Sequence, residues 1–107
     1  MNRGDVVTIA LSGAYGKPRP AVIIQSNFFE AHSSVTVLPI TSDLREAPLM
    51  RLDIEPSSAN GLRMPSQVMV DKAQTVPRAK IGKVIGTLEA EVIIAMNRSL
   101  TVFLGLA

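Results

Sequence analysis

Short runs of apolar and β-branched residues, separated by turn-forming residues, fill the first three quarters of the chain. Such runs are typical of β-strands, because branched side chains pack well on a pleated sheet. Pro20–Gln25 is continuously apolar, as expected of a strand buried on both faces, whereas Leu49–Ile54 alternates and is typical of a half-exposed strand. The pattern predicts strands at Asp5–Leu11, Pro20–Gln25, Val35–Pro39, Leu49–Ile54, Gln67–Val70 and Ala73–Val76.

Helical periodicity replaces this pattern in the last quarter of the chain. The apolar residues that recur at helical spacing are Val92, Ile93, Met96, Leu100, Phe103 and Leu104. Thr87 is a candidate N-cap, and Glu89 and Glu91 fall in the first turn, where the helix dipole favours negative charge. Gly105 follows the predicted end. We therefore predict an amphipathic helix over Leu88–Leu104 that covers the sheet.

Strands that precede a helix without alternating with it predict a mainly β fold with a C-terminal helix, an α+β arrangement with a barrel-like sheet. The 107 residues are enough for a single domain spanning 1–107. An apolar content of 47% excludes a disordered chain.

The composition limits the available chemistry. The absence of Cys excludes disulfides, thiolate zinc sites and cysteine nucleophiles, and a single His excludes a paired-imidazole mechanism. The carboxylates are scattered and the common nucleotide-binding motifs are missing, so we expect no metal and no cofactor. A net charge of +2 and four aromatic residues exclude a broad basic surface and a platform of stacking rings.

The first residues, Met1–Asp5, include polar and charged side chains before any apolar run begins, so they do not predict a signal peptide. No later run approaches the ~20 apolar residues that span a bilayer. We therefore expect a cytoplasmic protein with no membrane contact.

Arg19 is flanked by Pro18 and Pro20, and the residue before a proline is held in an extended conformation. Arg19 is therefore presented at the start of a predicted strand with little backbone freedom. A planar guanidinium donates to two oxygens at once, which suits a phosphate. A solvated loop arginine is the alternative interpretation.

Thr41 and Ser42 come just after the predicted strand Val35–Pro39. Hydroxyls at a strand end can donate to a phosphate oxygen, although Ser and Thr also favour ordinary turns. Lys17 and Arg63 are further candidate phosphate contacts, or simply solvated side chains.

Asp71 interrupts an apolar run. Its carboxylate can accept a proton from an attacking hydroxyl or orient Arg19. A turn aspartate, or an exposed ion pair with Lys72, explains the same position without any catalytic role. His32 lies in a polar stretch and is interpreted as a surface residue.

Several segments form an ordered set along nearly the whole chain: Arg3–Val7 (RGDVV), Gly16–Ile24 (GKPRPAVII), Val37–Ser42 (VLPITS), Val70–Thr75 (VDKAQT), Lys80–Gly82 (KIG) and the helix end Leu104–Leu106 (LGL). Taken together, they resemble the MazF/PemK/Kid toxins. Their order makes the resemblance more specific than any single motif.

The resemblance implies the toxin of a type II toxin–antitoxin pair with an SH3-like barrel, the CcdB/MazF-type toxin fold, working as a homodimer. It implies a metal-independent endoribonuclease that cleaves single-stranded RNA at short sequences to 2′,3′-cyclic phosphate and 5′-hydroxyl ends and so arrests growth. Arg19 matches the family's catalytic arginine and Thr41 its transition-state hydroxyl. Asp71 falls where Kid-like members carry a catalytic aspartate, but the arginine that those members have two residues earlier is Met69 here.

Cleavage by the RNA's own 2′-hydroxyl needs a base, an acid and a group that holds charge on the phosphate. Arg19 suits the last role, because a guanidinium loses its proton only above about pH 12. Asp71 or water is then left as the base.

The resemblance also makes Ser12–Lys17 a flap beside an RNA groove. In that flap Tyr15 stacks on a base or lies on its own barrel, and Lys17 and Ser42 are further RNA contacts. The cognate antitoxin is expected to be an acidic, partly disordered segment that folds over this groove.

Two other functions stay open. A CcdB-like toxin poisons DNA gyrase through a C-terminal Trp-Gly-Ile, but this chain ends in Leu104-Gly105-Leu106-Ala107 and has no Trp. An inactive family member would act only as a binding module.

Overall fold

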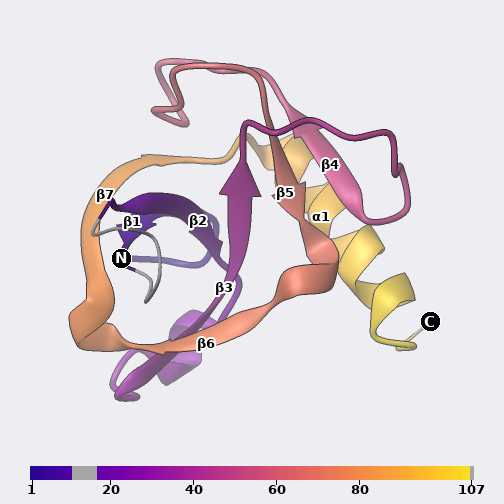
Figure 1. The fold of residues 1–107 in the computed structure, drawn as a ribbon. Helices are drawn as coiled ribbons and strands as arrows, with labels where there is room; N and C mark the ends of the chain where they lie inside the picture. The colour runs from indigo at the N-terminus through magenta and orange to yellow at the C-terminus, as the bar shows by residue number, and fades with distance from the viewer. Residues whose placement is uncertain (11–16, 107) are drawn as a thin grey trace.

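The computed structural model describes residues 1–10 and 17–106 of the chain. Within them, seven antiparallel strands form a curved sheet that is followed by an α-helix (Figure 1). The strands are β1 (Asp5–Ile9), β2 (Arg19–Ile23), β3 (Ser34–Thr41), β4 (Arg51–Ile54), β5 (Ser66–Met69), β6 (Gln74–Pro77) and β7 (Ile81–Thr87). The helix is α1 (Ala90–Phe103), and short 3-10 turns lie at η1 (Asn27–Phe29), η2 (Val70–Lys72) and η3 (Arg78–Lys80). A mainly β fold with a C-terminal helix is thereby confirmed.

The strand order is β4-β5-β3-β2-β1-β7, and β6 also pairs with β3. β5 pairs with the end of β3 around Thr41, and β6 pairs with its beginning at Ser34–Val37. The 3-10 turn η2 interrupts the chain between these two strands. The segment from β5 to β6 therefore follows β3 backwards from its end to its start.

The three central strands, β1, β2 and β3, are buried on both faces, because a separate apolar cluster lies on each side of the sheet. Alternate residues of a strand point to opposite faces. Val6, Val22 and Leu38 belong to the cluster that includes Met96 and Leu100 of the helix. The other cluster is formed by Val7, Ile9, Ala21, Ile23, Val35 and Val37. This double burial explains why these strands are continuous apolar runs in the sequence, and it confirms that the helix covers the sheet.

The ends of several elements differ from the predicted ones. The predicted N-cap is wrong: Thr87 ends β7 and its hydroxyl donates to Asp5 Oδ1 at 2.9 Å, while Glu89 occupies the N-cap position without a side-chain capping bond. Gly105 does follow the helix, with a φ of +73°. No helix in the described part of the chain has both the length and the apolarity that a membrane span requires.

Strand β7 is missing from the predicted elements. It pairs with β1 with two shifts of register, and two of its seven residues are Gly. Strand β3 is longer than predicted, so that Thr41 is its last residue and does not lie in the following loop.

Candidate active site

The register of the sheet brings Arg19 and Thr41 together. Ala21 of β2 lies opposite Pro39 of β3. Because the two strands are antiparallel, Arg19, two residues before Ala21, comes opposite Thr41, two residues after Pro39. Residues opposite one another in a sheet point to the same face. Two residues that are 22 positions apart in sequence thus share one face at one end of the sheet.

An open cavity of about 770 Å³ lies at this end of the sheet. Its polar lining consists of Thr8, Arg19, Thr41, Ser42, Asp43, Arg63 and Ser66. Its apolar lining consists of Pro18, Pro20, Pro39, Ile40, Leu62, Met64, Met69 and Ile85, and Gly61 completes it. The residues come from five strands, β1, β2, β3, β5 and β7, and from the segments before β2, β4 and β5, so the cavity exists only in the folded chain.

The Arg19 guanidinium is available for an anionic ligand. Arg19 is exposed and is the first residue of β2, where its backbone pairs with Ile9 of β1 and Pro20 pairs with Thr8. Pairing and the two prolines fix the backbone. Within residues 1–10 and 17–106, no carboxylate forms an ion pair with this guanidinium. Its charge is therefore not neutralised by an ion pair within these residues, and Arg19 lines the cavity.

The Thr41 hydroxyl is oriented by the loop that follows it. The backbone N–H of Asp43 donates to Thr41 Oγ1 at 3.0 Å. A hydroxyl has one proton and two lone pairs, so a lone pair is used here and the proton remains to be donated. Thr41 is half-buried. The arrangement presents a hydrogen-bond donor to the cavity beside a cation.

Other residues named from the sequence lie in different places. Ser42 and Arg63 line the cavity. Lys17 is exposed and does not line it, and Tyr15 lies outside the described residues. His32 is exposed, and its Nδ1 accepts from the backbone N–H of Ser34 at 3.2 Å.

The structure does not bring Asp71 to the cavity with Arg19 and Thr41. Asp71 lies in η2, and its Oδ2 is 3.4 Å from Lys72 Nζ. By register, Gln67 is opposite Thr41, so η2 is placed beside the middle of β3. The ion pair with Lys72 is the simpler of the two interpretations that the sequence left open.

Sequence reasoning missed Asp43 and the apolar wall formed by Leu62, Met64, Met69 and Ile85. Locally, Asp43 is an ordinary turn residue, and the four apolar residues come from the loop before β5, the end of β5 and β7, so no local signal marks either feature. Among the described residues, no group of three or more His, Asp or Glu lies close enough to hold a metal ion.

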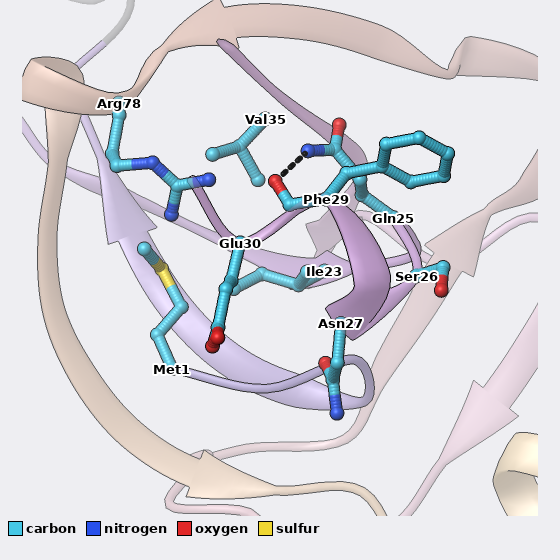
Figure 2. Close-up of a pocket in the computed structure, with 9 residues that line it drawn as sticks. All are labelled: Met1, Ile23, Gln25, Ser26, Asn27, Phe29, Glu30, Val35 and Arg78. Carbon is cyan, nitrogen blue, oxygen red and sulfur yellow. Dashed lines mark hydrogen bonds between the residues drawn. The ribbon is translucent and has the colours of Figure 1, made fainter. Parts of the chain in front are cut away.

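A second cavity, of about 20 Å³, has room for about one water molecule. Figure 2 shows it between Met1, the segment after β2 and Arg78, with Gln25 Nε2 donating to the Phe29 carbonyl at 3.4 Å. Arg19, Thr41 and Asp71 do not line it. The cavity of about 770 Å³, which Arg19 and Thr41 line, is therefore the candidate active site.

Comparison with known proteins identifies the family of the chain. Residues 2–104 match the family of PemK-like, MazF-like toxins of type II toxin-antitoxin systems. The chain is 48% identical over 108 residues to a probable endoribonuclease MazF of Mycolicibacterium smegmatis, covering 100% of this chain and 99% of that one.

Two solved structures share the fold. Mycobacterium tuberculosis toxin MazF-mt6 is 30% identical with a TM-score of 0.79, and the match covers 95% of this chain and 98% of that one. An endoribonuclease from a Mycobacterial species, solved in complex with its cognate antitoxin, is 23% identical with a TM-score of 0.81, covering 100% and 97%. The latter similarity shows the fold alone.

Proposed function

The chain belongs to the PemK-like, MazF-like toxins of type II toxin–antitoxin systems, and from this premise we propose how it acts. It is a toxin with endoribonuclease activity. It cleaves single-stranded RNA at a short sequence without a metal ion, leaving a 2′,3′-cyclic phosphate and a 5′-hydroxyl. The observation that carries this proposal is the placement of Arg19 and Thr41 on one face of the sheet at one cavity.

The two side chains suit the charge that develops during cleavage. The 2′-hydroxyl attacks the adjacent phosphorus, the bond to the 5′-oxygen breaks, and negative charge grows on the non-bridging oxygens. The Arg19 fork donates to these oxygens, and the Thr41 proton, which the Asp43 contact leaves available, adds a second donor. Arg19 can also donate a hydrogen bond to the departing 5′-oxygen, which takes up a proton from water as the 5′-hydroxyl forms.

The proton of the 2′-hydroxyl passes to water in this proposal. Asp71, the carboxylate considered from the sequence, lies in η2 beside Lys72 and does not line the cavity. Arg19 is a poor base because its guanidinium keeps its proton in the physiological range.

The partners follow from the same premise. The related Mycobacterial endoribonuclease was solved with its cognate antitoxin. For this chain we assign an acidic antitoxin segment that covers the cavity and pairs with Arg19, and a homodimer as the working form. We also propose a cytoplasmic location, where single-stranded RNA is available as substrate.

End mapping on a defined RNA tests the activity. Purified protein with excess chelator should give 2′,3′-cyclic phosphate and 5′-hydroxyl ends at one short sequence, and should leave gyrase supercoiling unaffected. Arg19→Ala should lower kcat by about 10²–10³-fold, as expected for loss of a preorganised donor. Arg98→Ala, which removes an exposed arginine of α1, is the matched control and should retain activity. Near wild-type cleavage by Arg19→Ala would exclude this site.

A further inference from the structure

The side chain of Gln67 uses its full hydrogen-bonding capacity beside the candidate active site. Gln67 lies opposite Thr41 in the sheet and is 5% exposed. Its Oε1 accepts from the backbone N–H of Arg45 and from Arg51 Nη1, both at 3.0 Å. Its Nε2 donates to the carbonyl of Arg45 at 2.9 Å and to Asp53 Oδ1 at 2.8 Å. An amide side chain has two donors and two acceptor positions, and all four are occupied.

These bonds hold the loop that follows Thr41. Residues 42–50 connect β3 and β4 without a strand or helix, so the sheet does not fix their backbone. Gln67 binds both backbone groups of Arg45. Arg51 donates from the same Nη1 to Gln67 Oε1 and to the Asp43 carbonyl at 3.0 Å. The loop is thereby attached to the sheet at Arg45 and Asp43.

The same loop orients the Thr41 hydroxyl. The N–H of Asp43 is the group that donates to Thr41 Oγ1, and the Asp43 carbonyl is the group that Arg51 binds. A continuous series of contacts therefore runs from Gln67 through Arg51 and Asp43 to Thr41. If Gln67 released the loop, the Asp43 N–H would move and the hydroxyl proton would lose its direction.

We propose that Gln67 is a positioning residue for RNA cleavage, acting through Arg51 and Asp43 on the Thr41 hydroxyl. This inference rests on the proposed function. A glutamate does not replace it, because a carboxylate would place an acceptor oxygen against two other acceptors, the Arg45 carbonyl and Asp53 Oδ1. The position requires an amide.

A double-mutant cycle with single-turnover cleavage of a short fluorogenic RNA tests the inference. Gln67→Met keeps the side chain's length and removes its four hydrogen bonds. We expect kcat to fall about 10–100-fold with KM within about twofold, because only the geometry of the reacting groups is lost. In a Thr41→Val background the same change should cost less than about threefold, because the group it positions is already gone.

Gln25→Met is the matched control. Gln25 also bridges backbone groups, donating to the Ser34 carbonyl and accepting from the Thr36 N–H, but these bonds do not involve the loop that follows Thr41. It should keep wild-type kcat. Should Gln67→Met fail to fold, Arg51→Met removes the next contact in the series and should show the same dependence on Thr41.

Equal losses in the wild-type and Thr41→Val backgrounds would overturn the inference and make Gln67 a purely structural residue. That result is distinct from failure of the proposed function, in which the wild-type protein itself cleaves no RNA.

Discussion

Thr41 illustrates how a local contact determines what a side chain can do. A threonine hydroxyl at a strand end can accept and donate, and the Asp43 N–H occupies one of its lone pairs while its proton remains free to be donated. Arg19 and Thr41 were identified from the sequence because each has a local signal. Arg19 is flanked by two prolines, and Thr41 follows a predicted strand. Gln67 carries none, since its four partners lie 14 to 22 positions away. Such contacts become visible only once the strands are paired.

Replacing Thr41 separates the hydroxyl from the shape of the side chain. Thr41→Val keeps the shape and removes the donor, and should lower kcat about 10²-fold with little change in KM. Thr41→Ser retains the hydroxyl and should recover most of the activity. Single-turnover cleavage of one defined RNA measures both variants. A fully active Thr41→Val would exclude the hydroxyl from transition-state stabilisation.

Strand β7 was not predicted from the hydrophobic pattern, because one of its glycines is required by the close approach of another backbone segment and lowers the strand propensity of the sequence. Gly is unfavourable in strands, yet a Cβ at Gly86 would lie 2.4 Å from the carbonyl oxygen of Ala59, and one at Gly61 would lie 2.1 Å from that of Ile85. The loop before β5 therefore approaches the β7 backbone directly. This close approach brings Gly61 and Leu62 to the cavity beside Ile85.

Gly86→Ala should destabilise the protein by about 3 kcal/mol, at the upper end for overpacking, because the contacted atoms are backbone and cannot rotate away. Gly105→Ala is the matched control: it has a φ of +73° but open space around it, so it should cost only about 1 kcal/mol of backbone strain. Urea unfolding followed by circular dichroism measures both. Equal costs would mean that the loop yields to the methyl group.

Glu89 joins the same loop to the start of α1 and should make stability depend on pH. Ser57 Oγ donates to Glu89 Oε2 at 2.8 Å and Asn60 Nδ2 to Oε1 at 3.2 Å. The Ser57 hydrogen bond is the main cause that lowers the pKa of Glu89 below its ordinary value of 4.5, and the Glu89 backbone and Asn60 add to it. A lowered pKa in the folded state contributes stability that is present above pH 4.5 and is lost as pH falls through the folded value.

We therefore expect Glu89→Gln to lower Tm near pH 6 and this difference from wild type to shrink as the pH falls below about 4.5. Thermal unfolding at a series of pH values measures it. Glu91→Gln, in the same helical turn but exposed, is the control and should show no such convergence. If the difference in Tm between Glu89→Gln and wild type did not depend on pH, the charge of Glu89 would not contribute to stability.

The order of the elements could be predicted from the sequence, but their pairing could not. Six strands and the helix follow from local periodicity. The pairing of β1 with β7 joins strands from the two ends of the chain. Along one edge of β3, β5 pairs with the end of the strand and β6 pairs with its beginning. Hydrophobic patterns do not show which strands pair with each other. The separation of Asp71 from Thr41 along β3 could therefore not be predicted from the sequence either. The family resemblance supplied the architecture that periodicity alone left open.

The C-terminal surface of the molecule carries a group of exposed apolar side chains: Val102, Phe103, Leu104 and Leu106. They lie at the C-terminal end of α1 (Figure 1). Earlier in the helix, Met96 and Leu100 pack into the core. A contiguous exposed apolar patch of this kind marks an association surface. We therefore expect the homodimer to form through this end of the helix.

Phe103→Asp should shift the protein from dimer to monomer in sedimentation velocity at micromolar concentration, because dimerisation would bury a charge without a partner. Phe28→Asp is the matched control, since Phe28 is 87% exposed in η1, outside the C-terminal surface, and its replacement should leave the dimer intact. Dissociation by Phe28→Asp alone would place the interface at η1 instead, and a monomeric wild type would exclude the dimer altogether. RNA cleavage by the Phe103→Asp monomer should also be measured. Arg19 and Thr41 lie in one subunit, so dissociation does not separate these two groups. Any activity lost on dissociation would therefore come from the loss of RNA contacts that span the two subunits.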